Sequence, residues 1–172
     1  MKHVLLLLIL LASSAVWAGE TDLLANLPPD PGAAGKATLA GIDSDNDGVR
    51  DDVQRWIALT YPNSQKTRAA LTQMAKAKQK ILLNAADAIN ARSYAIESNR
   101  AYLCLSFVRR QIKGLSGKDS YNISGEMRAL YLNTYARSKA ALQHSQHLSG
   151  QFFSLPPDKS TGCDFNPDAM PN

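Results

Sequence analysis

Residues 64–90 read SQKTRAALTQMAKAKQKILLNAADAIN and contain neither glycine nor proline. On a helical wheel at about 100° per residue, most of the large apolar residues and alanines fall on one face. Polar residues fall on the opposite face, among them Lys66, Gln73, Lys76 and Lys80. This spacing predicts an amphipathic α-helix. Lys78 lies within the apolar face, so we expect its stem to follow the core and its ammonium group to reach water or a carboxylate from elsewhere in the chain.

The run without glycine or proline covers the 51 residues from Asn63 to Lys113. A single helix of that length would be about 75 Å long, which exceeds the size of a compact domain of this chain length. We therefore expect a break between Asn84 and Ser93. The helix that follows carries apolar residues over a wide arc, which predicts that it packs on more than one side and lies at the centre of the fold.

Further helices are predicted on both sides of this run. Residues 51–61 carry a short apolar set at helical spacing. Beyond the run, we expect a loop over 114–122, a helix cap at Ser124 and a last helix over 125–148 that Gly150 ends. The predicted fold is all-α: a small up-down bundle of about four helices with an extended N-terminal leader and an irregular C-terminal strap.

Residues 1–18 have the features of a secretory signal peptide. A basic start is followed by a leucine-rich run over residues 4–12 and by small residues that end at Ala18. The apolar run is shorter than the roughly 20 residues that a membrane-spanning helix requires. The chain is therefore expected to be exported, periplasmic or secreted, and not to be an integral membrane protein.

Cleavage after Ala18 would leave 154 residues, enough for one domain with a core. Prolines and glycines interrupt residues 19–40, which we interpret as the extended leader. Residues 41–172 would form the helical domain, including an acidic loop over 43–54.

Two cysteines, Cys104 and Cys163, are present. In an exported protein they favour a disulfide, because an oxidising compartment preserves it. Closing a loop of about 60 residues would stabilise the fold by roughly 4 kcal/mol in the chain-entropy model. The alternative is a pair of free thiols.

Residues 41–54 read GIDSDNDGVRDDVQ and place five aspartates within ten residues. Calcium prefers six to eight oxygen ligands at loosely constrained angles, and aspartates at alternate positions of a short loop supply them. Gly48, sixth from the first aspartate, permits the sharp turn that aims later ligands back at the ion. The predicted ligands are the side chains of Asp43, Asp45, Asp47, Asp51 and Gln54 and the carbonyl of Val49.

Position twelve of this loop departs from the usual calcium ligand. An EF-hand has a glutamate there that gives two oxygens, whereas Gln54 gives one neutral oxygen or none. We expect Asp51 to be the direct substitute and the affinity to be weak, on the order of 10⁻⁴ M. The alternative is a capped acidic turn without a metal, although unpaired aspartates at this density repel one another unless something neutralises them.

Residues 43–51 resemble the acidic repeat of thrombospondin type 3 modules and, more loosely, the loops of EF-hands and dockerins. The apolar residue stands at position seven, as in the thrombospondin repeat, and the loop occurs once rather than in tandem. The resemblance implies calcium binding through the aspartates. The whole chain also resembles a group of exported bacterial proteins that carry such a loop before helices and two cysteines, which implies no particular activity.

The charge distribution suggests a second kind of ligand. Residues 63–113 hold ten basic residues against two acidic ones, a formal charge of +8. A field of that sign attracts anions such as lipid phosphates or anionic polysaccharide. Lys66, Lys76 and Lys80 are the candidate anion-binding residues, and a solvated lysine face that keeps the protein soluble is the alternative.

No catalytic motif is evident in the sequence. Serines are frequent, but none stands in a glycine-flanked nucleophile motif. His144 and His147 are three residues apart and could share a transition metal, but they lie off the apolar face, so we expect a solvated pair.

The predicted function is that of an exported, non-enzymatic calcium-binding protein of structural or interaction type. Calcium would fix the junction between the leader and the helical domain. The alternative is a binding module for anionic envelope lipid or polysaccharide. The expected partners are the calcium ion and an anionic envelope component or another exported protein, and nucleic acid is not among them.

Overall fold

The computed structural model describes residues 25–112, 114–154 and 156–171. The predicted signal peptide and the first residues of the leader lie outside the described residues. The described part of the chain is all-helical and contains no strand, which confirms the predicted fold class. Its α-helices are α2 (Asp51–Thr60), α3 (Gln65–Leu83), α4 (Ala91–Gln111), α5 (Gly117–Tyr131) and α6 (Tyr135–Gln146). Short 3₁₀ helices are η1 (Ala34–Lys36), η2 (Lys159–Gly162) and η3 (Pro167–Ala169).

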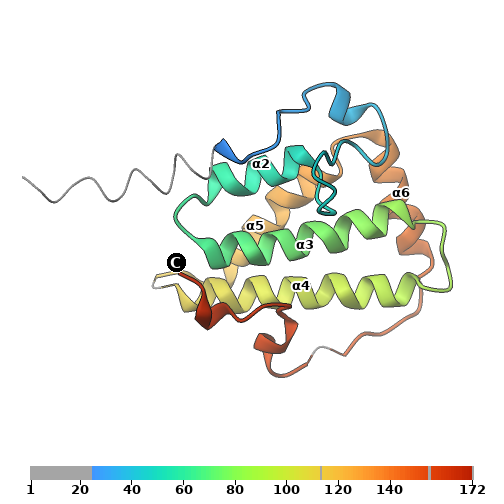
Figure 1. Cartoon of the computed structure of the whole chain (residues 1–172). Helices are drawn as coiled ribbons and strands as arrows, with labels where there is room; N and C mark the ends of the chain where they lie inside the picture. Colours follow the sequence, from blue (N-terminus) through green and yellow to red (C-terminus); the bar gives the residue numbers. More distant parts are fainter. Residues whose placement is uncertain (1–24, 113, 155, 172) are drawn as a thin grey trace, which may run out of the picture.

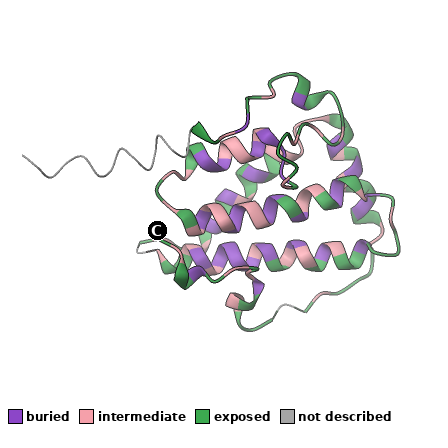
Figure 2. Ribbon diagram, viewed as in Figure 1, coloured by how far each residue is buried: buried purple, intermediate pink, exposed green. Residues whose placement is uncertain are grey.

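Helices α3 and α4 lie side by side and form the middle of the molecule (Figure 1). Buried residues recur along both helices (Figure 2). The predicted break between them is confirmed, because α3 ends at Leu83 and α4 begins at Ala91. The centre is shared: α3 packs against α2, α4, α5 and α6, whereas α4 packs against α3, α5 and the C-terminal segment. The core contains Leu71, Met74, Leu105, Val108 and Met127.

The prediction of one last helix over 125–148 is wrong. The chain forms α5 and α6 instead, separated by a turn at 132–134. Thr134 caps α6, because its hydroxyl accepts a hydrogen bond from the backbone N–H of Arg137 at 3.2 Å. The chain can therefore turn here without leaving that helix end unsatisfied.

The predicted loop over 114–122 is also shorter in the structure. Helix α5 begins at Gly117 through a capping box, in which Ser116 and Asp119 bond each other's backbone N–H groups. Ser124, the predicted cap, lies inside this helix. The capping box provides partners for the first backbone N–H groups of the helix at Ser116, eight residues before the predicted cap. The helix therefore begins earlier than predicted.

The C-terminal segment is a strap that runs along α4 (Figure 1). The predicted disulfide between Cys104 and Cys163 ties it to that helix, with 59 residues of sequence separation. Gln73 of α3 also holds the strap: its Nε2 donates to the carbonyl of Gly162 at 2.7 Å, and its Oε1 accepts from the backbone N–H of Asp164 at 3.1 Å. The strap is therefore fixed from two helices.

The described part of the leader is less extended than predicted and is held against the bundle. Residues 34–36 form η1, and Nη1 of Arg55 donates to the carbonyl of Pro28 at 2.7 Å. Nε2 of Gln79 on α3 donates to the carbonyl of Ala40 at 2.7 Å. None of the helices within the described residues is long and apolar enough to cross a membrane.

A pair of glycine substitutions tests the contact between strap and helix. A Cβ on Gly162 would lie 2.5 Å from the backbone oxygen of Arg100, so Gly162→Ala should lower the free energy of unfolding by about 1–3 kcal/mol. A Cβ on Gly125, inside α5, meets nothing within 4 Å. Gly125→Ala should raise the stability by about 0.5–1 kcal/mol. Urea unfolding of both variants measures the difference, and equal effects would contradict this contact.

Candidate metal centre

The acidic loop precedes α2 and brings three aspartates together. Asp43, Asp45 and Asp47 each place one carboxylate oxygen within 4.8 Å of the others. The chain reaches this arrangement by left-handed backbone conformations at Asn46 (φ 56°) and Gly48 (φ 88°). Glycine and asparagine tolerate that region best, which explains why these residue types stand at the turn. The first three predicted ligands are therefore neighbours in space as well as in sequence.

Hydrogen bonds inside the loop shape it. The carboxylate of Asp43 accepts from the backbone N–H groups of Asp47 at 3.2 Å and Gly48 at 3.0 Å. Oδ1 of Asp45 accepts from the N–H of Asp47 at 3.2 Å, and Oδ1 of Asp47 accepts from the N–H of Val49 at 2.7 Å. A carboxylate has more lone pairs than these bonds use, so the bonds are compatible with either predicted alternative, a calcium site or a capped acidic turn.

Asp51 lies outside this cluster. Its carboxylate is 2% exposed, and its Oδ1 accepts from the backbone N–H of Ser44 at 2.9 Å. Its own N–H donates to the carbonyl of Ile42 at 2.8 Å. Asp51 thus fastens the beginning of the loop to the start of α2, a role that the spacing of aspartates does not reveal.

Gln54, the residue at position twelve, contacts the cluster directly. Its Nε2 donates to Oδ2 of Asp45 at 3.0 Å, while its Oε1 is buried without a hydrogen-bond partner. The Val49 side chain, in contrast, is buried in the core.

The three aspartates differ in electrostatic environment. The hydrogen bond from Gln54 lowers the pKa of Asp45. Burial raises the pKa of Asp47, and the nearby charges of Asp45 and Asp43 add to this rise. The ammonium group of Lys76 on α3 opposes it from 4.0 Å. A cation bound at the cluster would favour the charged form of Asp47.

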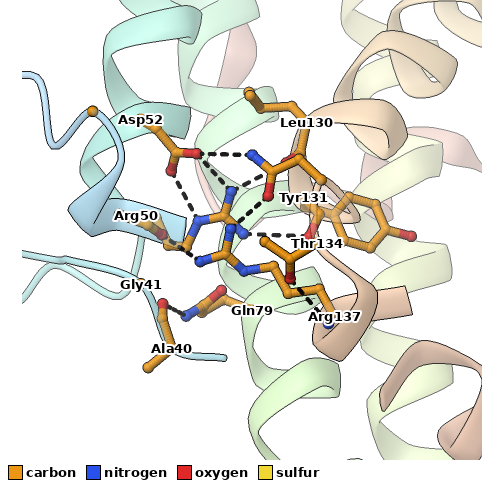
Figure 3. Close-up of polar contacts among 12 residues, drawn as sticks. Ala40, Gly41, Arg50, Asp52, Gln79, Leu130, Tyr131, Thr134 and Arg137 are labelled. Carbon is orange, nitrogen blue, oxygen red and sulfur yellow. Dashed lines mark hydrogen bonds and ion pairs between the residues drawn. The ribbon is translucent and has the colours of Figure 1, made fainter. Parts of the chain in front are cut away.

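Arg50, the residue before α2, is a buried anchor that the sequence analysis missed. It is 1% exposed, and its Nε and Nη2 bind both carboxylate oxygens of Asp52 at 2.8 and 2.7 Å. Its Nη2 and Nη1 also donate to the backbone carbonyls of Leu130 at 3.1 Å and Tyr131 at 3.3 Å (Figure 3). These carbonyls end α5, where the helix dipole favours a cation.

A second buried arginine, Arg137 of α6, lies beside the first (Figure 3). It donates to the carbonyls of Gly35 at 2.6 Å, Thr38 at 3.2 Å and Leu39 at 3.2 Å, and to Oδ1 of Asn133 at 2.5 Å. Burial lowers the pKa of Arg137, and the charge of Arg50 adds to this effect. An arginine nevertheless stays protonated in a protein, so its charge is balanced by these oxygens and by Asp52.

Asp52 and Gly41 fit around the two guanidinium groups. Burial would raise the pKa of Asp52, but the hydrogen bonds and charge of Arg50 outweigh it and the pKa is lowered. A Cβ on Gly41 (φ 75°) would lie 2.6 Å from Cδ of Arg50 and 2.8 Å from Nη2 of Arg137. Only glycine fits at this position, because the Cβ of any other residue would collide with the two arginine side chains.

Of the three predicted anion-binding lysines, Lys80 forms a close ion pair and Lys76 a more distant one. Nζ of Lys80 lies 2.8 Å from Oε2 of Glu97, and Lys76 faces Asp47. Lys66 is half-buried at the start of α3. Lys78 lies over the ring of Tyr131 at 5.7 Å, and burial lowers the pKa of its ammonium group.

The prediction of a solvated histidine pair is wrong. His144 is 4% exposed, and its Nε2 lies 3.0 Å from the carbonyl oxygen of Ala91. His147 is half-buried. Helix α6 packs against α3, and His144 contacts Ala91 at the start of α4. A helical wheel of one segment cannot predict such contacts with other helices.

The role of Arg137 can be tested by proteolysis. In Arg137→Met the carbonyls of residues 35–39 lose their donor, so the leader should detach and trypsin should cleave after the exposed Lys36 at least tenfold faster. Arg128→Met, at an exposed position of α5, is the matched control and should leave the cleavage rate unchanged. Equal rates in both variants would show that Arg137 does not hold the leader.

The resemblance of residues 43–51 to thrombospondin type 3 and EF-hand loops rests on the sequence motif. The geometry adds that three of its aspartates converge, that Gln54 donates a hydrogen bond to one of them, Asp45, and that Asp51 fastens the loop. No protein-family model, curated protein or solved structure matches this chain.

Proposed function

We propose that this chain is an exported, non-enzymatic calcium-binding protein in which the ion fixes the junction between leader and helical domain. The observation that carries the proposal is the convergence of three carboxylates within 4.8 Å on one short loop. Calcium takes oxygen ligands at 2.3–2.6 Å in flexible geometry, and such a cluster offers them with little rearrangement. The cysteine pair Cys104–Cys163 supports export, because disulfides persist in oxidising compartments.

Gln54 gives further support for a ligand at this place. A rotation of its amide by 180° would turn the unpartnered Oε1 toward Asp45 and the ion. Together with Asp43, Asp45, Asp47 and the Val49 carbonyl, this oxygen would leave the remaining positions to water. A neutral amide in place of a bidentate glutamate predicts a weak site, on the order of 10⁻⁴ M, in the range of extracellular modules.

The expected role of the ion is structural. The ligand loop is followed directly by Arg50 and Asp51, which connect it to α5 and to its own first residues. Arg50 lies beside Arg137, which binds the carbonyls of residues 35–39, so an ion that orders the loop would also support the attachment of the leader. At 1 mM calcium and an affinity near 10⁻⁴ M, linkage gives roughly 1.4 kcal/mol of added stability.

Calorimetry of the protein with calcium tests this function. Uptake of one ion at millimolar calcium is expected. Asp45→Asn should weaken binding at least tenfold, because Asp45 is an exposed member of the cluster and its loss leaves the fold intact. Asp30→Asn, an exposed aspartate in the leader, should behave as the unchanged protein. No uptake, or equal uptake with Asp45→Asn, would refute the calcium site.

Substitutions of Asp51 distinguish a calcium ligand from a residue that only holds the loop in shape. In Asp51→Ala the N–H of Ser44 loses its hydrogen bond to a buried carboxylate, so the free energy of unfolding without calcium should fall by about 1–3 kcal/mol. Asp51→Asn keeps an oxygen acceptor and should lose less stability. If Asp51→Asn abolishes calcium uptake as fully as Asp45→Asn does, Asp51 is a direct ligand instead of a fastening residue.

The alternative function, binding of anionic envelope lipid or polysaccharide through Lys66, Lys76 and Lys80, makes a different prediction. Such binding would weaken steeply with salt, whereas stabilisation by calcium ligation would depend on salt much less. Binding of the protein to anionic vesicles at two salt concentrations distinguishes the two functions.

A further inference from the structure

A cavity of about 350 Å³ opens between α3, α4 and the strap. Its apolar walls are formed by Ala69, Ala77 and Phe165, and its charged walls by Lys76, Glu97 and Asp164. This volume is at the lower end of the range for small-molecule sites.

The walls of this cavity are held in place by contacts on three sides. The disulfide between Cys104 and Cys163 fixes the strap to α4, and both ends of the Gln73 amide bind the strap backbone. Gly162 lies so close to α4 that no Cβ fits there. The cavity is thus preformed, which lowers the entropy that a ligand loses on binding.

The charged side chains around the cavity differ in the distance to their ion-pair partners. Oε2 of Glu97 lies 2.8 Å from Nζ of Lys80, and Oδ1 of Asp164 lies 3.1 Å from Nη2 of Arg100. The acid nearest to Lys76 is Asp47, at 4.0 Å, which exceeds hydrogen-bonding distance. Among these charged side chains of the described residues, Lys76 has the most distant partner, so its ammonium group is the one best able to meet a ligand.

We propose that this cavity binds a small organic carboxylate with a short apolar body. The ammonium group of Lys76 binds the carboxylate, and the apolar body lies against Ala69, Ala77 and Phe165. The two engaged acids repel a second negative charge, so a monoanion fits better than a dianion.

Lys76 also connects this cavity to the calcium loop, a link that rests on the proposed function. Its ammonium group faces Asp47, and its stem lies beside Gly48. A calcium ion bound by Asp47 would repel the ammonium group of Lys76. That group would then be available to bind the carboxylate of the ligand. By thermodynamic linkage, calcium and carboxylate then strengthen each other's binding by the same factor.

Nuclear magnetic resonance titration with sodium hexanoate tests the cavity, with hexanol and hexylammonium as matched probes. Hexanoate should give saturable shifts at Ala77 and Phe165, while the two other probes bind at least tenfold more weakly. Lys76→Gln should weaken hexanoate binding at least tenfold, and Lys118→Gln, at an exposed site on α5, should not. Ala69→Leu, which narrows the cavity and keeps Lys76, should also weaken it. Equal binding of hexanoate and hexanol, or no effect of Lys76→Gln, overturns the proposal.

The same titration with calcium separates the two proposals. Saturating calcium should tighten hexanoate binding threefold or more. If calcium binds by calorimetry and hexanoate binding stays the same, the link through Lys76 is wrong. If calcium does not bind at all, the proposed function fails, and the calcium-free titration still decides whether the cavity takes a carboxylate.

Discussion

Two buried arginines beside one carboxylate hold this molecule together. Arg50 and Arg137 are almost completely inaccessible; Asp52 forms an ion pair with Arg50, and its charge also acts on Arg137. Buried charges are strongly destabilising unless they are paired and fully hydrogen-bonded. The remaining donors therefore need the carbonyls that end α5 and those of residues 35–39. Leader, acidic loop and the α5–α6 turn must come together at once, which makes this junction cooperative.

The contacts of this junction set the orientation of the acidic loop. Arg50 and Asp51 follow the aspartate cluster directly. Arg50 is bound to the end of α5, and Asp51 binds the beginning of the loop through the backbone N–H of Ser44. Gly41 enters the loop over the two guanidinium groups, where a side chain does not fit. The cluster of carboxylates is thus supported by a buried network in addition to the hydrogen bonds inside the loop, which favours a preorganised site.

Helix α3 connects this junction with the rest of the protein. Gln79 reaches the leader, Lys76 reaches the acidic loop and Gln73 reaches the strap, all from the face that the wheel assigns to solvent or its edge. The opposite face forms the core. One helix therefore positions the candidate metal centre and the cavity next to each other.

Local patterns in the amino-acid sequence were sufficient to predict several parts of this structure. Apolar spacing gave the α3 and α4 helices and their break, the cysteine pair gave the disulfide, and alternate aspartates with Gly48 gave the cluster. Local caps at Ser116 and Thr134 mark the two-helix end of the bundle, whereas the fastening role of Asp51 became visible only in the folded structure. Tertiary structure also decided the burial of Arg50 and Arg137, because their backbone acceptors lie 80 to 102 residues away, and a carbonyl carries no residue-type signal.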